Sequence, residues 1–359
     1  MKAFRCALLL VPLGLLLLAA VVGANVIGRD NPPGAERDTV IHPPMPRPIP
    51  PRPGDAVDAL IDDLDIGPSE RHGGLTLYPL RRRNDSGFVP MTFDEGVSSG
   101  DLVVREIEQR GSVNEVEVRN RSGRPAFLMG GQMLFGSKQD RMFQRDALIG
   151  PYSEWTRVPV YCVERDRWTP VSEYFSGKQQ AVAPALRRAA EESASQTEIW
   201  GGVARQREEQ GVAKGRTETY GAIYEDAQVQ SRLREYRERF KPIPGWGTCG
   251  VVAVGGRGII CADIFGDRAL FARLWDSLLD SYVLDEAKHS GWPVTDEREV
   301  RDFLRQAHSD RAGHHGAPTP GIGEAMRISG STSGAALSYR REAVHVSLYP
   351  RLYRPLIER

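Results

Sequence analysis

Apolar positions recur with a period of two in the first half of the chain. Leu75 and Leu77 begin one such segment, and residues 102–109 and 114–119 alternate apolar with charged side chains. Residues 126–129 form a short run that is apolar throughout. Because side chains alternate between the two faces of a strand, this pattern predicts half-exposed antiparallel strands that lead into a glycine-rich turn at Gly130.

Beyond residue 168 the spacing becomes helical. Pro184 suits the first position of a helix, and Ser195 with Glu198 has the spacing of a capping box. Residues 220–240 carry apolar side chains three and four apart, which predicts one helix that Pro242 ends. The charged residues of these helices are predicted to form solvated faces.

A predicted hairpin over residues 249–264 turns at residues 255–256, and an amphipathic helix with Asp267 as its N-cap follows it. The apolar stripe of that helix, residues 270–282, is predicted to cover the sheet. The remaining segments are a helix (295–307), a loop (309–320) and three short strands (325–329, 335–340 and 343–349). This order favours the α+β class: a single domain over residues 55–359, with a mainly antiparallel sheet covered by amphipathic helices.

The N-terminus has the pattern of an export signal. Lys2 and Arg5 precede the apolar run 7–22, and small residues end at Ala24. Residues 1–24 are therefore a signal peptide or, since the run approaches the length that spans a bilayer, an uncleaved membrane anchor. The proline-rich residues 25–54 predict a disordered linker. Both alternatives place the domain outside the cytoplasm, either secreted or periplasmic or anchored to a membrane by this segment.

Charge and cysteine content narrow the possible partners. The 47 basic and 47 acidic side chains balance, so no basic field favours nucleic acid as a partner. Cys162, Cys249 and Cys261 are an odd number outside the leader. The predicted hairpin would pair Cys249 with Ala262 and place its thiol on the opposite face from that of Cys261. We therefore expect no disulfide between them, and we expect all three cysteines to be small buried residues.

Residues 130–168 gather more kinds of polar side chain than any other stretch. Gly131–Lys138 is similar to a phosphate loop, but Ser137 precedes Lys138, the reverse of the required order, which excludes a nucleotide triphosphatase.

Cys162 and Glu164 share one face of a predicted strand, where a carboxylate beside a thiol would act as a general base or orient a nucleophile. The predicted catalytic residues are Glu164, Cys162 and Asp140, and the predicted substrate-binding residues are Gln132, Lys138, Gln139, Arg141, Arg167 and Trp168. The alternative is structural: Glu164 and Arg167 pair with Arg141 and Asp140 in a buried network that pins the turn.

Histidines give weaker signals. His308, Asp310, His314 and His315 lie in or beside a loop without a recognised metal-ligand spacing, so we predict a solvated loop and no metal site or other cofactor. His345 points away from its neighbours Val344 and Val346, which leaves the surface or a second sheet face as its place.

Several of these motifs, in this order, resemble one known family. Gly131-Gln132, residues 138–141, Cys162-Val163-Glu164 and Arg167-Trp168 are similar to the ADP-ribosylglycohydrolase- and rhodanese-phosphatase-associated protein domain. The resemblance continues through residues 195–200, 250–265 and 344–348, and it covers most of residues 75–349 as one domain. Where the family would have a Glu and an Asn, this chain has Gln132 and Asp140.

The resemblance implies an activity only through the domains that the family accompanies, which suggest nucleotide, ADP-ribose or phosphate-ester chemistry. We expect an exported or membrane-tethered domain that binds or hydrolyses a small anionic ligand containing ribose or phosphate. If the protein is an enzyme, it is a hydrolase. The alternative is a non-catalytic binding or interaction module of the cell envelope, in which the same residues form a structural polar core.

Overall fold

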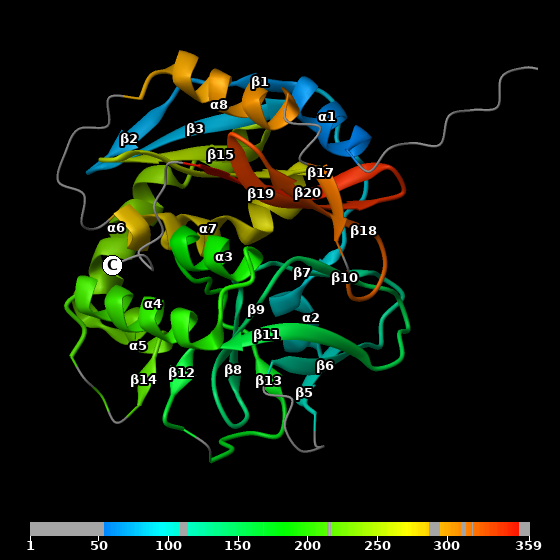
Figure 1. The fold of residues 1–359 in the computed structure, drawn as a ribbon, viewed down its shortest axis with the longest axis vertical. Helices are drawn as coiled ribbons and strands as arrows, with labels where there is room; N and C mark the ends of the chain where they lie inside the picture. Colours follow the sequence, from blue (N-terminus) through cyan, green and yellow to red (C-terminus); the bar gives the residue numbers. More distant parts are fainter. Residues whose placement is uncertain are drawn as a thin grey trace, which may run out of the picture. The chain divides into compact units, whose positions relative to one another are not determined.

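A nine-stranded sheet is the largest element that the described residues form. The computed structural model describes residues 54–107, 114–167, 169–213, 215, 217–286, 295–309, 314–317 and 319–351. The large sheet has the order β1-β3-β15-β16-β20-β19-β18-β17, with β2 paired beside β3 (Figure 1). Its strands are β1 (Leu64–Ile66), β2 (Glu70–His72), β3 (Leu75–Arg82), β15 (Thr248–Gly255), β16 (Gly258–Phe265), β17 (His314–Ala317), β18 (Glu324–Ser329), β19 (Thr332–Tyr339) and β20 (Glu342–Pro350).

Smaller sheets carry most of the first half of the chain. One has the order β13-β8-β9-β11-β6-β5, a second β10-β7-β4, and a third pairs β12 with β14. The strands are β4 (Met91–Thr92), β5 (Leu102–Glu106), β6 (Glu115–Asn120), β7 (Ala126–Leu128), β8 (Met133–Gly136), β9 (Arg141–Phe143), β10 (Ala147–Ile149), β11 (Thr156–Cys162), β12 (Glu164–Arg165), β13 (Phe175–Ser176) and β14 (Glu218–Thr219). The pair β4 and β7 is parallel, whereas the other strand pairs described here are antiparallel.

Helices cover both faces of the large sheet. They are α1 (Asp55–Asp62), α2 (Phe93–Ser99), α3 (Pro184–Glu191), α4 (Gln196–Glu209), α5 (Gly221–Glu225), α6 (Ala227–Phe240), α7 (Arg268–Glu286) and α8 (Glu297–Ser309), with a short 3-10 helix η1 (Ile243–Trp246). On one face α1 and α8 enclose a core with the sheet that includes Leu60 and Phe303 (Figure 1). On the other face α7 packs against β15 and β16, with Leu274 and Leu278 in the main core. The centre of the sheet is therefore buried on both sides, and any polar side chain there must find partners.

The predicted class, α+β with mainly antiparallel sheets, is confirmed. Pro184 is the first residue of α3, and the predicted capping box forms: the Ser195 hydroxyl accepts from Glu198 N, and the Glu198 carboxylate accepts from Ser195 N. The apolar stripe of α7 covers the sheet as predicted, and Asp267 caps it by accepting from Ala269 N.

Three local predictions are wrong. Residues 220–240 form two helices because the Asp226 side chain caps a new one at Gln228 and Val229. The hairpin turns at residues 256–257, and a bulge shifts its register, so Cys261 pairs with Ala253 rather than Gly250. Part of the predicted loop 309–320 is strand β17, which pairs with β18.

Several predictions concern residues outside the described ranges: the leader 1–24, the linker up to residue 53, Trp168 and Asp310. All three cysteines predicted to be buried are buried thiols, and no disulfide joins them in the described structure. Within the described part of the chain, no helix is both long and apolar enough to cross a membrane.

Candidate functional site

The structure brings three of the predicted site residues together at the turn between β8 and β9. Glu164 Oε2 accepts from Arg167 Nε at 2.7 Å and from Asp140 N at 3.0 Å. Arg167 Nη2 donates to Asp140 Oδ1 at 3.0 Å, and Thr219 Oγ1 donates to Asp140 Oδ2 at 3.1 Å. We call Asp140, Glu164, Arg167 and Thr219 the hairpin network.

The hairpin network is saturated by its own bonds. Arg167 also donates to the carbonyl oxygen of Ser137 at 2.8 Å, and Gly136 N donates to Asp140 Oδ1 at 3.1 Å. Glu164 is 3% exposed. Burial raises the pKa of Asp140, and the hydrogen bond to Glu164 raises the pKa of Arg167. These bonds tie the turn to β12 and β14, which is what a structural ion pair does.

Arg141 takes other partners than the predicted ones. Its Nη2 donates to both carboxylate oxygens of Glu106 at 2.9 Å, and its Nη1 donates to Cys162 Sγ at 3.2 Å. Arg141 and Cys162 are cross-strand neighbours on β9 and β11. Burial raises the pKa of Cys162, which keeps it a thiol at neutral pH.

The other predicted residues lie apart from the hairpin network's bonds. Gln132 is buried and donates to Asp94 Oδ2 at 2.5 Å. Gln139 is 1% exposed, and neither atom of its amide has a partner in the described structure. Lys138 is exposed. None of the predicted residues within the described ranges lines either of the two cavities described below.

A second polar cluster lies in the main core, between α3 and the large sheet. Arg187 and Glu191 are four residues apart on α3 and so face the same side. Asp263 comes from β16, His345 from β20, and Asp146 from the segment between β9 and β10. We call Asp146, Arg187, Glu191, Asp263 and His345 the pocket network.

The innermost part of the pocket network is an ion pair. Arg187 Nη1 and Nη2 donate to the two oxygens of Asp263 at 2.9 and 2.8 Å, and the two side chains are 1% and 0% exposed. Burial opposes both charges, but each partner favours the other's ionised form, so the pKa of Asp263 is held well below its ordinary range. Tyr282 OH also donates to Asp263, at 2.6 Å. This pair anchors α3 to the sheet.

His345 links that ion pair to the edge of the core. Its Nε2 lies 3.3 Å from Asp263 Oδ1 and its Nδ1 lies 2.6 Å from Asp146 Oδ2. Burial lowers the pKa of His345, but Asp146 and Asp263 outweigh it and raise the pKa to about 9. With a carboxylate on each ring nitrogen, the imidazole is doubly protonated at neutral pH. The ring stacks on Phe265 at 4.2 Å between centroids.

The glycine turn after β7 holds Asp146 and leaves room for Arg187. Gly130 N donates to Asp146 Oδ1 at 2.7 Å. Gly131 has φ +79°, and a Cβ there would lie 2.2 Å from Arg187 Cγ. The turn that begins the predicted polar stretch therefore supports the pocket network as well as the hairpin network.

Two members of the pocket network have an unmet hydrogen-bonding group, Arg187 at Nε and Glu191 at Oε2, and of these two only Glu191 lines the cavities described below. Glu191 Oε1 accepts from Ser347 Oγ at 2.8 Å and more weakly from Tyr349 OH at 3.4 Å. Its Oε2 is buried and has no hydrogen-bond partner in the described structure. Burial, and then the nearby charge of Asp146, raise the pKa of Glu191 to about 8. Glu191 is therefore a neutral acid at pH 7 with one oxygen uncommitted.

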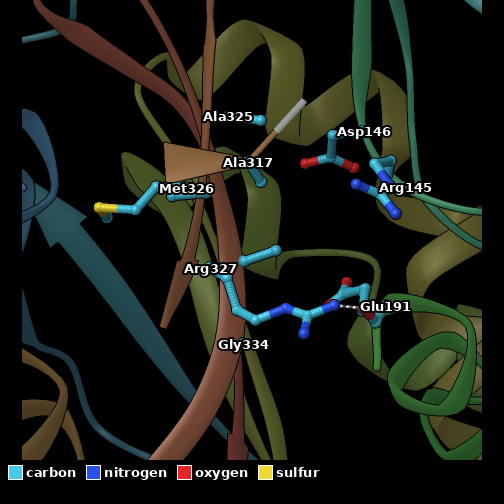
Figure 2. Close-up of a pocket in the computed structure, with 10 residues that line it drawn as sticks. Arg145, Asp146, Glu191, Ala317, Ala325, Met326, Arg327 and Gly334 are labelled. Carbon is cyan, nitrogen blue, oxygen red and sulfur yellow. Dashed lines mark hydrogen bonds between the residues drawn. The ribbon is translucent and has the colours of Figure 1, made fainter. Parts of the chain in front are cut away.

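Two cavities meet at Glu191. The first cavity has a volume of ≈ 30 Å³ and its polar lining is Arg145, Asp146, Glu191 and Arg327. The second has a volume of ≈ 160 Å³ and its polar lining is Arg188, Glu191, Glu192, Arg327, Ser329 and Ser333. Figure 2 shows Arg327 reaching across to Glu191, whose carbonyl oxygen accepts from Arg327 Nη2 at 2.9 Å, with Asp146 and Arg145 on the side of β10.

The cavity walls are rich in guanidinium groups. Burial lowers the pKa of Arg145, and the positive charge of Arg327 lowers it further. Both arginines line the first cavity, and two guanidinium groups on one cavity favour an anion as its occupant. Within the described residues, no group of side chains has the composition of a metal site.

Sequence reasoning missed the pocket network. Arg187 and Glu191 were expected on a solvated helix face, which is wrong because that face packs against β16 and β20. His345 does lie on the second sheet face, but it is 1% exposed rather than solvated. One signal was available: Asp263 is the only charged residue in the apolar segment 258–265, and a lone charge in a buried strand requires partners.

Comparison with known proteins gives one match. A family model of the ARG and Rhodanese-Phosphatase-superfamily-associated Protein domain matches residues 63–349, which include both networks. No curated protein and no solved structure matches the chain. Because the matched region covers well over half of the 359 residues, the chain belongs to the family of the ARG and Rhodanese-Phosphatase-superfamily-associated Protein domain.

Proposed function

We propose that the protein is a hydrolase that binds a small anionic ligand containing ribose or phosphate at Glu191, where the two cavities meet, with the reacting bond in the first cavity. The observation that carries the proposal is Glu191: a neutral acid with an unpartnered oxygen, at the junction of two cavities lined by arginines. A carboxyl group in that state is suited to donate a proton to a leaving group.

Asp146 supplies the complementary carboxylate. It lines the same cavity, and its two oxygens are held by His345 Nδ1 and Gly130 N. A pair of carboxyl groups, one acting as acid and the other as base, is the usual arrangement in glycoside and related hydrolyses. In the proposed step, Asp146 accepts a proton from water, and the water oxygen bonds to the electrophilic carbon or phosphorus. The bond to the leaving oxygen breaks, and Glu191 gives its proton to that oxygen.

Arg145 and Arg327 have the role of anion contacts. Both line the first cavity, on opposite sides in Figure 2, and both remain positively charged at neutral pH. The earlier prediction assigned this role to Lys138 and Arg141, and the catalytic roles to Glu164, Cys162 and Asp140. That assignment remains a hypothesis, and its support is weaker because none of these residues lines either of the two cavities.

A panel of ligands with a matched pair of variants tests the proposal. Wild-type protein is incubated with ADP-ribose, ribose 5-phosphate and nucleotide sugars, and product formation is followed by chromatography. Glu191→Gln keeps the size and the hydrogen bond from Ser347 but removes the transferable proton, so we expect a loss of about 100-fold or more. Glu208→Gln, on an exposed position of α4, is the control and should keep full activity.

Two outcomes contradict the proposal. Hydrolysis by Glu191→Gln at the wild-type rate would remove Glu191 from the chemistry. Binding of these ligands without hydrolysis by the wild-type protein would favour the alternative, a non-catalytic binding module.

The site of action is a separate part of the proposal. We place the domain outside the cytoplasm because residues 1–24 have the pattern of an export signal or anchor. N-terminal sequencing of the protein from its native host decides between the two forms: a start at Asn25 means cleavage, and a start at Met1 in the membrane fraction means an anchor. A start at Met1 in the cytoplasm would contradict export.

A further inference from the structure

We propose that the second cavity is a subsite for a phosphate monoester, which holds the phosphate of the substrate while the reacting bond lies at Glu191 in the first cavity. Only the placement of the reacting bond at Glu191 rests on the proposed function. Phosphate binding in the second cavity stands on its own geometry.

The two cavities differ in size in a way that separates their roles. A cavity needs roughly 10–15 Å³ to hold one water molecule. The first cavity, at ≈ 30 Å³, therefore has space for the attacking water and the reacting atoms only. The second, at ≈ 160 Å³, has space for a group the size of phosphate. Glu191, Arg327 and Gly334 line both, so a ligand can extend from one to the other.

Donors surround the second cavity from three elements. Arg188 comes from α3, Arg327 from β18 and Ser333 from β19. Arg188 is held in place because its Nε donates to Glu192 at 2.8 Å and its Nη1 donates to the carbonyl oxygen of Pro350 at 3.2 Å. Donors from several directions match an anion with three terminal oxygens better than a planar carboxylate.

Ser333 provides an independent sign of a missing partner. Its hydroxyl oxygen is buried and has no hydrogen-bond partner in the described structure. Buried hydroxyls are nearly always satisfied, and a ligand oxygen in the second cavity would satisfy this one. Glu191, whose Oε2 is the other unmet atom, lines the same cavity as Ser333.

The charge of the second cavity is compatible with a dianion. Arg188 and Arg327 carry the positive charges, Glu192 pairs with Arg188, and Glu191 is neutral at pH 7 because burial raises its pKa. Since Glu192 is already paired with Arg188, Arg327 is the less neutralised of the two arginines. Arg327 Nη2 donates hydrogen bonds to the carbonyl oxygen of Glu191 and to Ser193 Oγ. Its Nε and Nη1 have no hydrogen-bond partner in the described part of the chain.

The test is binding of inorganic phosphate, ribose 5-phosphate and ribose to the full chain carrying Glu191→Gln, measured by calorimetry. This background cannot donate the proton but keeps the second cavity, so failure of hydrolysis and failure of phosphate binding are separate results. We expect ribose 5-phosphate to bind, inorganic phosphate to bind more weakly, and ribose to show no measurable binding.

Variants then locate the phosphate. Ser333→Ala should weaken the binding of inorganic phosphate by about tenfold, the effect of one hydrogen bond to a charged group. Arg188→Gln should weaken it further, and Arg145→Gln, which changes the first cavity alone, should weaken it less than Arg188→Gln. Arg234→Gln, at an exposed position of α6, is the control and should leave it unchanged. Unchanged affinity in both Ser333→Ala and Arg188→Gln would overturn the proposal. So would a larger loss of phosphate binding in Arg145→Gln than in Arg188→Gln, because the anion would then occupy the first cavity.

Discussion

The hairpin network and the pocket network contain similar side chains, but they differ in whether a buried carboxylate oxygen is left without a hydrogen-bond partner in the described structure. In the hairpin network Glu164, Asp140 and Arg167 satisfy one another and the backbone of the turn. In the pocket network both terminal nitrogens of Arg187 bind Asp263, and both ring nitrogens of His345 face carboxylates. Glu191, which lines two cavities, has one buried oxygen without a partner. A stretch of sequence that is dense in polar residues can therefore form a purely structural hydrogen-bond network. A buried polar group without a partner, on a residue that lines a cavity, is the better indication of a binding site.

The largest expected effect is the loss of stability when the inner ion pair of the pocket network is broken. Arg187→Met removes one partner of a fully buried ion pair and leaves Asp263 charged in the core. We expect the free energy of unfolding to fall by about 3–5 kcal/mol, measured by urea denaturation. A loss below about 1 kcal/mol would mean that water reaches Asp263 and that the inner pair is not structural.

The dependence of stability on pH tests the protonation state of Glu191. Its pKa is raised from 4.5 in the unfolded chain to about 8, so between these values the folded protein holds a proton that the unfolded chain has lost. Wild-type stability should therefore fall as pH rises through this window, by up to about 1.4 kcal/mol per pH unit. Glu191→Gln lacks this loss, so its stability relative to wild type should rise from pH 5 to pH 8.

His345 gives the pH experiment an internal control. Its raised pKa, about 9 against 6.5 in the unfolded chain, contributes stability that is complete below pH 6.5 and lost as pH rises towards 9. Because this contribution is present in both proteins, it cancels in their difference. Parallel stability curves for wild type and Glu191→Gln would show that Glu191 is ionised in the folded protein.

The smallest expected effect is the difference in alkylation rate between Cys162, which the sequence predicted to be catalytic, and the other two cysteines. All three cysteines are buried, and burial raises the pKa of Cys162 and of Cys261 and raises that of Cys249 to about 12. In native protein we expect iodoacetamide to label the three at equally slow rates that unfolding controls. Faster labelling of Cys162 would restore it as a candidate nucleophile.

The sequence predicted the architecture better than the site, and the reason is physical. Period-two segments and the stripe of α7 report burial directly, because each position along an element faces a fixed side. Local chemistry that pattern alone does not carry caused the errors: the cap at Asp226 split one helix, and a bulge moved the register around Cys261.

The pocket network could not be assembled from the sequence because its members come from four separate parts of the chain. Asp146, Arg187, Asp263 and His345 meet only after β16 and β20 pair and α3 packs on them. Spacing along the chain contains no information about such a meeting. The hairpin network, in contrast, lies mostly within residues 136–167 and was visible as a polar stretch.

The most direct test of the account compares Glu164→Gln with Glu191→Gln in two measurements, the free energy of unfolding and the hydrolysis rate per folded molecule. Breaking the buried hairpin network should cost about 3 kcal/mol of stability in Glu164→Gln, while the protein that remains folded keeps its activity. Glu191→Gln should be at least as stable as wild type at pH 8 and lose its activity. The reverse pattern, an inactive but stable Glu164→Gln and an active Glu191→Gln, would contradict the account.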